Sequence, residues 1–400
     1  MSTAPDAHGS MVHPSSKRVE FVDLLRGWAV IVMVETHIAN ATLTPEISAS
    51  GFFQYVKFFN GLVAPSFLFA SGLAYAITTR RKLHDYLSWG RPLFRQFGRL
   101  FFILALGYML HVPKFSFEKV LNETTTQDWQ VFFQVDILHC IAVSLLLVQV
   151  VLLVLKDERK LYLALAVLAI AIVFATPYVW GVDFWTIVPW PIAAYLNGLH
   201  FSLFPLFPWS AFLIAGAVTG YFYLQARDVT IAETGAANDR RYTKILFGIG
   251  SVLVLLSFAI EPLAAGLYRT YDYWMFSPSF VLLRLGLVLL LCAGMLHYEQ
   301  RHGVPAKSIV TLVGRESLVV YVVHLLMIYG DFGKFNFVKE VDHTFGYGVA
   351  AIATAVLLIT MYVLALIWSR IKRSSPRLKL VINLGTLVGA LGMFFFGPGE

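Results

Sequence analysis

Eleven apolar stretches divide this chain of 400 residues, and short polar segments separate them. A helix needs about 20 predominantly apolar residues to cross the hydrocarbon core of a bilayer. Hydrophobic residues make up 58% of the chain and charged residues only 14%, whereas soluble domains carry about 25% charged residues. The pattern excludes a soluble domain and predicts an all-α, polytopic membrane helix bundle. We place its transmembrane helices near 21–39, 52–77, 97–112, 131–155, 161–179, 203–225, 244–262, 279–298, 308–329, 346–369 and 379–396.

Lysine and arginine are distributed unevenly between the segments that separate these stretches. If the N-terminus and alternate loops are cytoplasmic, 22 of the 31 lie on that side, six lie opposite, and three lie within or at the ends of helices. Because cytoplasmic loops are enriched in positive charge, we predict a cytoplasmic N-terminus and an extracytoplasmic C-terminus. The net charge of +7 then serves topology, so the expected partner is the lipid bilayer and not nucleic acid. Residues 1–18 form a polar cytoplasmic tail, and 19–400 form a single transmembrane domain.

The first apolar stretch carries four ionisable side chains, Asp23, Arg26, Glu35 and His37. Each costs at least ~2.5–3.5 kcal/mol at bilayer depth, which indicates a function inside the bundle. At 100° per residue, Asp23, Arg26 and His37 share one stripe of the helix, and Glu35 points elsewhere. Asp23 and Arg26 are three residues apart and can form an ion pair, which either stabilises the fold or belongs to a site.

Two further stretches place ionisable groups at the predicted outer depth of His37. Asp136 and His139 share a face of the fourth helix, where the carboxylate can fix the tautomer of the imidazole; the alternative is a bond that merely satisfies both groups. Arg284 lies about two turns into the eighth helix and needs a counter-charge there. Asp136, Glu35 and Glu261 are the candidates, and we predict that Asp136 and Arg284 are energetically coupled.

The ninth stretch places Ser317, Tyr321 and His324 on or near one face, from its inner end to the midplane. A helix-packing hydrogen bond is the alternative interpretation for His324. The chain has no zinc motif of the His-Glu-x-x-His kind, no Walker loop and no Gly-x-Ser-x-Gly elbow. Neither a metal nor a serine nucleophile is therefore predicted.

Four segments of the chain resemble the transmembrane acyltransferase superfamily, in particular bacterial proteins that carry the heparan-α-glucosaminide N-acetyltransferase catalytic domain. The resemblance covers about residues 18–330. It is carried by Arg18-x-x-x-x-Asp23-x-x-Arg26-Gly27-x-Ala29 with Met33 and His37, by Asn60-Gly61-Leu62-Val63-Ala64-Pro65-Ser66-Phe67-Leu68-Phe69 with Gly72, by Gln134-Val135-Asp136-Ile137-Leu138-His139, and by Gly314-Arg315-Glu316-Ser317 with Tyr321 and His324.

The resemblance implies a multi-pass enzyme of the bacterial inner membrane. Acetyl-CoA or another acyl-CoA would enter from the cytoplasm, and a histidine would assist acyl transfer to an amine or hydroxyl of an extracytoplasmic sugar, glycan or lipid-linked acceptor. The candidate catalytic residues are His37, Asp136, His139, Arg284 and His324, and the candidate motif residues are Asp23, Arg26, Glu35, Ser317 and Tyr321. The candidate ligands of the CoA phosphates are Arg80, Arg81, Arg95 and Arg99.

One departure from the resembled pattern concerns the catalytic histidine. The sugar acetyltransferases carry it in the loop after the first helix, but loop 40–51 of this chain holds no histidine. Either His37 takes over the role, as in the related O-acyltransferases, or the protein does something else. A proton-coupled secondary transporter is the principal alternative, although the sequence shows no internal repeat of the kind that many transporters have. A homodimer is compatible with the sequence.

Overall fold

The computed structural model describes residues 19–374 apart from 113–115, 235–239, 306 and 331–335, and it describes scattered positions between 378 and 396. The described part consists of helices and loops without a β-sheet; its one bridge joins Leu43 to Phe345. The long helices are α1 (Glu20–Thr42), α3 (Gly51–Asn60), α4 (Val63–Arg81), α6 (Arg91–Leu110), α9 (Ile137–Leu155), α10 (Glu158–Trp180), α12 (Leu206–Thr234), α13 (Arg240–Leu267), α15 (Pro278–His302), α17 (Ser317–Tyr329) and α19 (Tyr347–Ser374).

Short helices connect the long ones. They are α2 (Pro45–Ala49), α5 (Leu83–Leu87), α7 (Phe117–Asn122), α8 (Thr126–Phe132), η1 (Phe184–Thr186), α11 (Trp190–Ala193), α14 (Tyr273–Phe276), α16 (Ile309–Arg315) and α18 (Phe337–Val341).

Each of the first ten predicted stretches coincides with a helix or a helix pair. Among the described residues, eight helical segments are long and apolar enough to cross a membrane, or nine if a bent pair forms one span. The polytopic all-α prediction is therefore confirmed. The helix α1 is not one of these segments, because its most apolar part carries three charged residues, Asp23, Arg26 and Glu35. The eleventh predicted stretch, 379–396, lies largely outside the described residues, so the total of eleven and the orientation remain predictions.

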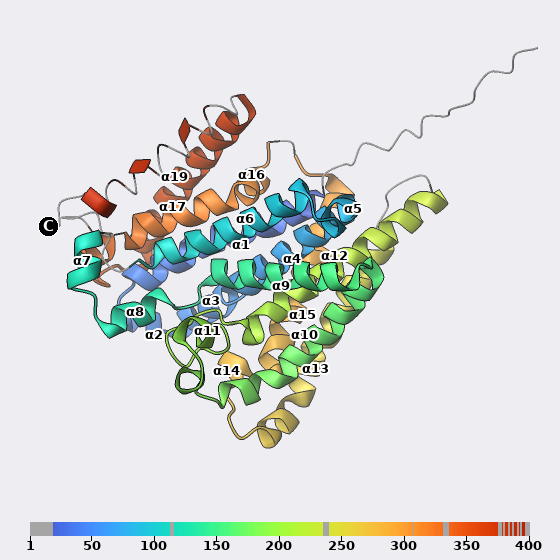
Figure 1. Ribbon diagram of the computed structural model, residues 1–400, viewed down its shortest axis with the longest axis horizontal. Coiled ribbons are helices and arrows are strands. Elements are labelled where there is room, and N and C mark those ends of the chain that lie inside the picture. The colour runs from blue at the N-terminus through green and yellow to red at the C-terminus, as the bar shows by residue number, and fades with distance from the viewer. Residues whose placement is uncertain are drawn as a thin grey trace, which may run out of the picture.

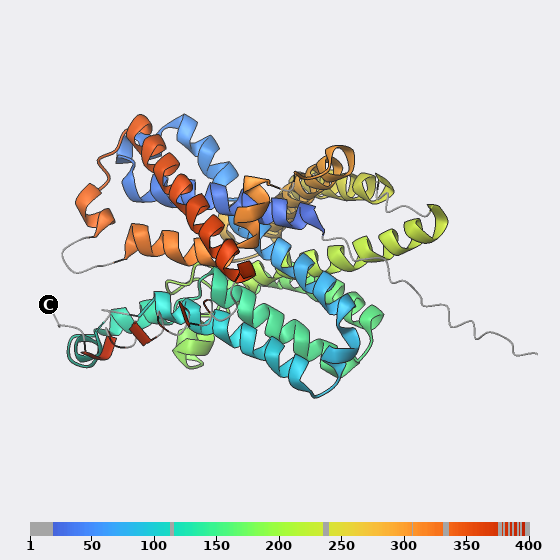
Figure 2. The same cartoon turned by 90° about the horizontal axis from the view of Figure 1, so that it is seen from above.

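The first helix lies at the centre of the arrangement (Figures 1 and 2). It packs against α4, α15, α16, α17 and α19, while α4 packs on α12, α6 on α9, and α13 on α15. Buried apolar side chains from α1, α4, α9 and α12, such as Val30, Leu68, Leu138 and Phe212, form the core between these helices. Other helices therefore surround α1, and its polar side chains lie next to protein.

Glycines let the backbones approach closely at two crossings. A Cβ atom at Gly27 of α1 would lie 1.9 Å from the Val310 carbonyl oxygen, and one at Gly314 of α16 would lie 2.0 Å from the Asp23 carbonyl oxygen. A Cβ atom at Gly72 of α4 would lie 1.8 Å from the carbonyl oxygen of Leu213 in α12. Small residues are the usual means of such approach between membrane helices. The first crossing places the inner end of α1 directly against α16.

The predicted ninth span, 308–329, is a broken helix and not a straight one. Its halves α16 and α17 meet at an angle of 85°, and Glu316 lies at the break. The Lys372 ammonium of α19 donates to the buried Glu316 carboxylate at 2.6 Å. Irregular backbone is tolerated at membrane depth only where protein or a water-filled cavity surrounds it. The break therefore lies in the interior of the bundle, covered by α19.

Candidate active site

Two imidazoles from different helices meet near the predicted outer end of α1. The ring centroids of His37 on α1 and His324 on α17 lie 5.3 Å apart. The Nδ1 atom of His37 lies 3.1 Å from the hydroxyl oxygen of Tyr329, at the end of α17. Both histidines are predicted site residues, whereas Tyr329 is not; its only signal in the sequence is a phenol at the same predicted depth.

The hydrogen bonds of His324 leave one of its nitrogens as a base. Its Nδ1 atom lies 2.8 Å from the Val320 carbonyl oxygen, and since a carbonyl only accepts, Nδ1 must carry the proton. The neutral ring then has its lone pair on Nε2, which is buried and has no partner among the described residues. The helix-packing bond expected as the alternative role of His324 is thus present at Nδ1, and Nε2 remains able to accept a proton.

Tyr321 and Asp136 extend this group toward α9. The Tyr321 hydroxyl donates to Asp136 Oδ2 at 2.7 Å, and the rings of Tyr321 and His324 lie 5.7 Å apart. Asp136 also caps α9, because its Oδ1 atom accepts from the Ile137 amide at 2.6 Å. Both side chains are buried. The carboxylate therefore ties the start of α9 to the histidine-bearing helix α17.

His139 does not contact the Asp136 carboxylate as expected. Instead the backbone amide of Asp136 donates to His139 Nδ1 at 3.2 Å, which completes the cap of α9. The ring packs on Tyr108 of α6 at 4.3 Å between centroids, and a Cβ atom at Gly107 would lie 2.7 Å from it. The side-chain interaction that we predicted is wrong, because the imidazole reaches back to the backbone amide of Asp136, while the Asp136 carboxylate accepts from the Ile137 amide and from Tyr321. His139 belongs to the α6–α9 contact and not to the His37–His324 pair.

The predicted ion pair of Arg284 is also wrong for the described residues. Its Nη1 atom donates to the Phe58 carbonyl oxygen, and its guanidinium lies 4.6 Å from the Phe58 ring centroid and 5.3 Å from that of Phe280. A carbonyl dipole and two aromatic faces replace the carboxylate. A Cβ atom at Gly61 would lie 2.6 Å from Nη2, so only glycine leaves room for this arrangement.

The three candidate counter-charges are engaged elsewhere. Tyr321 and the α9 amide occupy Asp136, and the Asn60 side chain lies beside Glu35. The Tyr271 hydroxyl donates to Glu261. In the resembled segment at 60–69, Gly61 has a structural role, since it accommodates Arg284.

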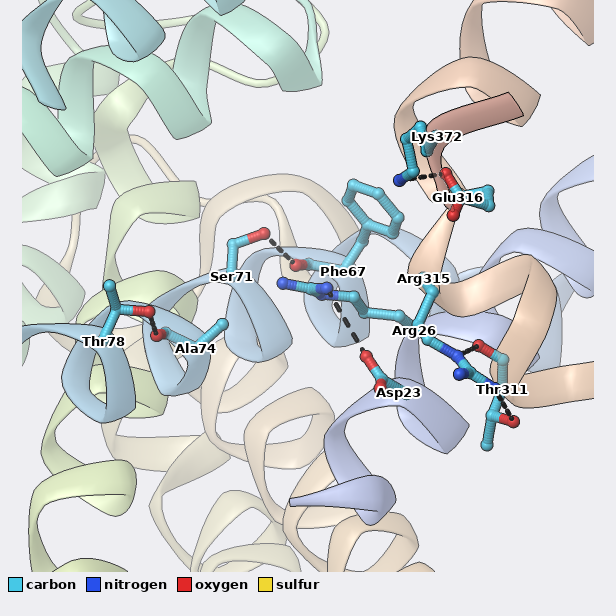
Figure 3. Close-up of polar contacts among 10 residues, drawn as sticks. All are labelled: Asp23, Arg26, Phe67, Ser71, Ala74, Thr78, Thr311, Arg315, Glu316 and Lys372. Atoms are coloured by element: carbon cyan, nitrogen blue, oxygen red, sulfur yellow. Dashed lines mark hydrogen bonds and ion pairs between the residues drawn. The ribbon is translucent and has the colours of Figure 1, made fainter. Parts of the chain in front are cut away.

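A second polar group lies at the other end of α1 (Figure 3). The predicted Asp23–Arg26 ion pair is confirmed, with 3.8 Å between Nη1 and Oδ1. Across the glycine crossing, Arg315 is folded back onto Thr311, its Nε atom donating to the carbonyl oxygen at 3.0 Å and its Nη2 atom to the hydroxyl at 3.2 Å. Ser317 begins α17 just beyond the break. The single helix α1 therefore carries both the Asp23–Arg26 pair and His37. A rise of 1.5 Å per residue places Arg26 and His37 roughly 16 Å apart along the helix axis.

The four arginines predicted for CoA phosphates fall into different surroundings. Arg80 donates to Glu158 at 2.7 Å and to Asp228 at 2.8 Å, so it joins α4 to α10 and α12. Arg81 is exposed at the end of α4. Arg95 and Arg99 lie with Arg91 on the exposed side of α6, where they border a shallow, open hollow together with Phe94, Gly98 and Phe102 of the same helix.

Asp136 and Tyr321 should be energetically coupled, and Asp136 and Arg284 should not. Tyr321→Phe leaves a buried carboxylate oxygen without its donor, a defect of about 1–3 kcal/mol. In a double-mutant cycle of unfolding in detergent, Tyr321→Phe and Asp136→Ala should deviate from additivity by about 0.5–3 kcal/mol. As the control, Arg284→Gln and Asp136→Ala should add to within about 0.5 kcal/mol. The opposite outcome would restore the original Asp136–Arg284 prediction.

No group of three or more histidine, cysteine or acidic side chains is placed to hold a metal ion within the described part of the chain. No curated protein matches the sequence. Residues 18–259, which are 242 of the 400, match the family model described as "Heparan-alpha-glucosaminide N-acetyltransferase, catalytic". The matched region contains His37, Asp136 and His139, while Arg284 and the α17 residues lie beyond it. This multi-pass membrane protein therefore belongs to the family of the heparan-α-glucosaminide N-acetyltransferase catalytic domain.

Proposed function

We propose that this protein transfers an acyl group, acetyl as in its family, from cytoplasmic acyl-CoA to a hydroxyl or amine of an extracytoplasmic sugar or glycan. Its location would be the inner membrane of a bacterium. The observation that supports the proposal best is the His37–His324 pair, which joins two helices at the predicted outer end of the bundle. Acyl transfer needs a base near neutrality to take the acceptor proton, and an imidazole supplies one.

His37 is the proposed general base. The Tyr329 hydroxyl lies 3.4 Å from the His37 carbonyl oxygen, which can only accept. When the hydroxyl donates there, His37 Nδ1–H donates to the Tyr329 oxygen, and Nε2 carries the lone pair. Nε2 of His37 would take the proton from the acceptor while the hydroxyl oxygen or amine nitrogen of the acceptor attacks the thioester carbonyl carbon. The carbon–sulfur bond then breaks, and CoA leaves as the thiol once a proton returns to sulfur.

Unpartnered buried donors could stabilise the oxyanion that forms on the thioester carbonyl. Among the described residues, Arg284 Nε and the Ser66 hydroxyl are buried without a hydrogen-bond partner. The Tyr321 hydroxyl is engaged with Asp136, so we give Tyr321 a positioning role and keep Arg284 and Ser66 as the candidate donors.

The hollow on α6 is the proposed site for the nucleotide part of CoA. Three arginines one turn apart, Arg91, Arg95 and Arg99, suit phosphate groups, and the adjacent Phe94 and Phe102 offer faces for an adenine ring. Arg80 is withdrawn from this role because its two carboxylate partners neutralise it. The extended pantetheine arm would then carry the thioester toward His37.

Substitutions in the hollow should weaken acyl-CoA binding without blocking chemistry. Arg95→Gln and Arg99→Gln should each raise the KM for acetyl-CoA about 5- to 20-fold, as loss of a charge-assisted contact of about 1–2 kcal/mol implies, and the effect should shrink at high salt. Arg81→Gln, an exposed arginine outside the hollow, is the matched control and should leave KM unchanged. Arg80→Gln should lower thermal stability instead.

The assay that tests the function itself uses sealed vesicles of known orientation. Acetyl-CoA supplied on the cytoplasmic face should acetylate an amino sugar supplied on the opposite face, and CoA thiol should appear in step with the product. If acetyl-CoA were consumed only from the outer face, or if solute moved without thioester cleavage, the transporter interpretation would replace the proposal.

A further inference from the structure

A groove between α13 and α15 lies outside the candidate active site. It has a volume of about 480 Å³ and lies between the first two turns of α13 and the second half of α15. None of its lining residues belongs to the His37 group, to the Asp23–Arg26 group or to the hollow on α6. The acyl-transfer proposal therefore does not account for it.

One end of the groove is basic. Arg240 and Lys244 are exposed, lie one turn apart at the start of α13, and face His297 of α15 across the opening. The described lining contains no acidic residue. The first turn of a helix also presents amides without intrahelical partners and the positive end of the helix dipole. This end of the groove suits an anion.

The wall beside these cations contains a donor without a protein acceptor. The Thr243 hydroxyl donates to Gln300 Oε1 at 3.2 Å, which fixes the orientation of the Gln300 amide. The Nε2 group of Gln300 is buried and has no hydrogen-bond partner within the described part of the molecule. Both residues line the groove, so an acceptor oxygen at its polar end would complete the network.

The other end of the groove is apolar and open. Phe247 is 61% exposed and faces Leu290 and Ala293 across a floor at Gly294, where a Cβ atom would meet nothing within 4 Å. Farther along α13, Val252 and Leu255 are also exposed, as expected of a surface in hydrocarbon. The groove therefore changes from cationic to apolar from the helix end toward the membrane interior.

We propose that this groove binds one anionic phospholipid. Its phosphate lies against Arg240 and Lys244, its headgroup oxygens accept from Gln300, and an acyl chain follows Phe247 and Gly294. The predicted orientation places this end of both helices at the cytoplasmic leaflet, where basic pockets between helices bind anionic headgroups. The match of charge and apolarity along one groove distinguishes this ligand from a soluble anion, which would leave the apolar half unfilled.

Native mass spectrometry of the delipidated full chain in detergent can test the proposal. We expect one molecule of phosphatidylglycerol to bind more tightly than phosphatidylcholine with the same acyl chains. Each basic residue near an anionic headgroup contributes about fivefold in affinity, so Arg240→Gln with Lys244→Gln should weaken phosphatidylglycerol binding by more than about tenfold. Gly294→Leu should weaken binding of both lipids, because it fills the floor without changing charge.

Arg241→Gln is the matched control, because Arg241 is the exposed neighbour of Arg240 but does not line the groove. It should bind phosphatidylglycerol as the wild type does. Equal weakening by Arg241→Gln would show general surface attraction and overturn the proposal, as would wild-type binding by the Arg240/Lys244 double variant. Displacement of the lipid by an equal concentration of glycerol 3-phosphate would identify a soluble ligand instead. Because the readout is lipid binding, it does not depend on acyl transfer.

Discussion

Replacement of His37 by alanine is expected to lower the rate of acyl transfer by about 10²–10⁴-fold, the usual contribution of a positioned general base. The reason is geometric. His37 is the half-buried member of the pair, it is held by Tyr329, and it faces His324 at 5.3 Å between ring centroids. The measurement is the turnover of acetyl-CoA by the purified variant in detergent, with KM for acetyl-CoA determined in the same experiment.

The variant must remain folded for this result to be informative. Size-exclusion chromatography and thermal unfolding should match the wild type, since the half-buried His37 is replaced by a smaller apolar residue. His139→Gln is the matched control, because this histidine packs against α6 and should keep most of the activity. A folded His37→Ala protein with wild-type turnover, together with an inactive His139→Gln protein, would move the role of the base to His139.

Replacement of Gly72 by valine is expected to abolish the folded protein. A Cβ atom at this position would lie 1.8 Å from the Leu213 carbonyl oxygen, and backbone atoms of α4 and α12 cannot yield as a flexible side chain can. The helices must separate, which should cost about 3 kcal/mol or more. The measurement is the yield of monodisperse protein after solubilisation, followed by thermal unfolding of whatever is recovered.

Gly248→Val provides the contrast within the same chain. Gly248 is exposed on α13, and a Cβ atom there would meet nothing within 4 Å. This variant should be recovered in wild-type yield, since the membrane surface accepts an added apolar side chain. If both variants behaved alike, the α4–α12 crossing would be looser than the structure describes.

The fold was predictable to the extent that hydropathy determines it. A run of apolar residues must form a helix in lipid because only a helix satisfies its own backbone groups, so the first ten stretches were located correctly. The break at Glu316 was not predicted. Its signal was present in Gly314-Arg315-Glu316-Ser317, two charged residues inside an apolar stretch. The angle of 85° and the partner of Glu316, Lys372, could not be predicted because Lys372 is distant in sequence.

The site was predictable only where partners share a helix. Helical spacing predicted the Asp23–Arg26 pair. The contact between His37 and His324 was not predicted, because the straight ninth span placed His324 no farther out than the midplane. Arg284 was misassigned because its true partner is the backbone carbonyl of Phe58, and the sequence does not mark which carbonyls the end of a helix leaves accessible. The ion pairs of Arg80 were not predicted, because its carboxylate partners lie on two other helices.

The central position of α1 also bears on how the two sides of the membrane could communicate. A secondary transporter exposes one substrate site alternately to the two sides of the membrane, and one half of the molecule typically rocks against the other to do so. Here a single 23-residue helix, packed on its sides against α4, α15, α16, α17 and α19 among others, keeps one polar group near each of its ends. In the predicted orientation, each end would serve its own compartment continuously. Under the proposed function, the moving part would be the flexible arm of the acyl-CoA donor, and the protein could stay still while the acyl group crosses.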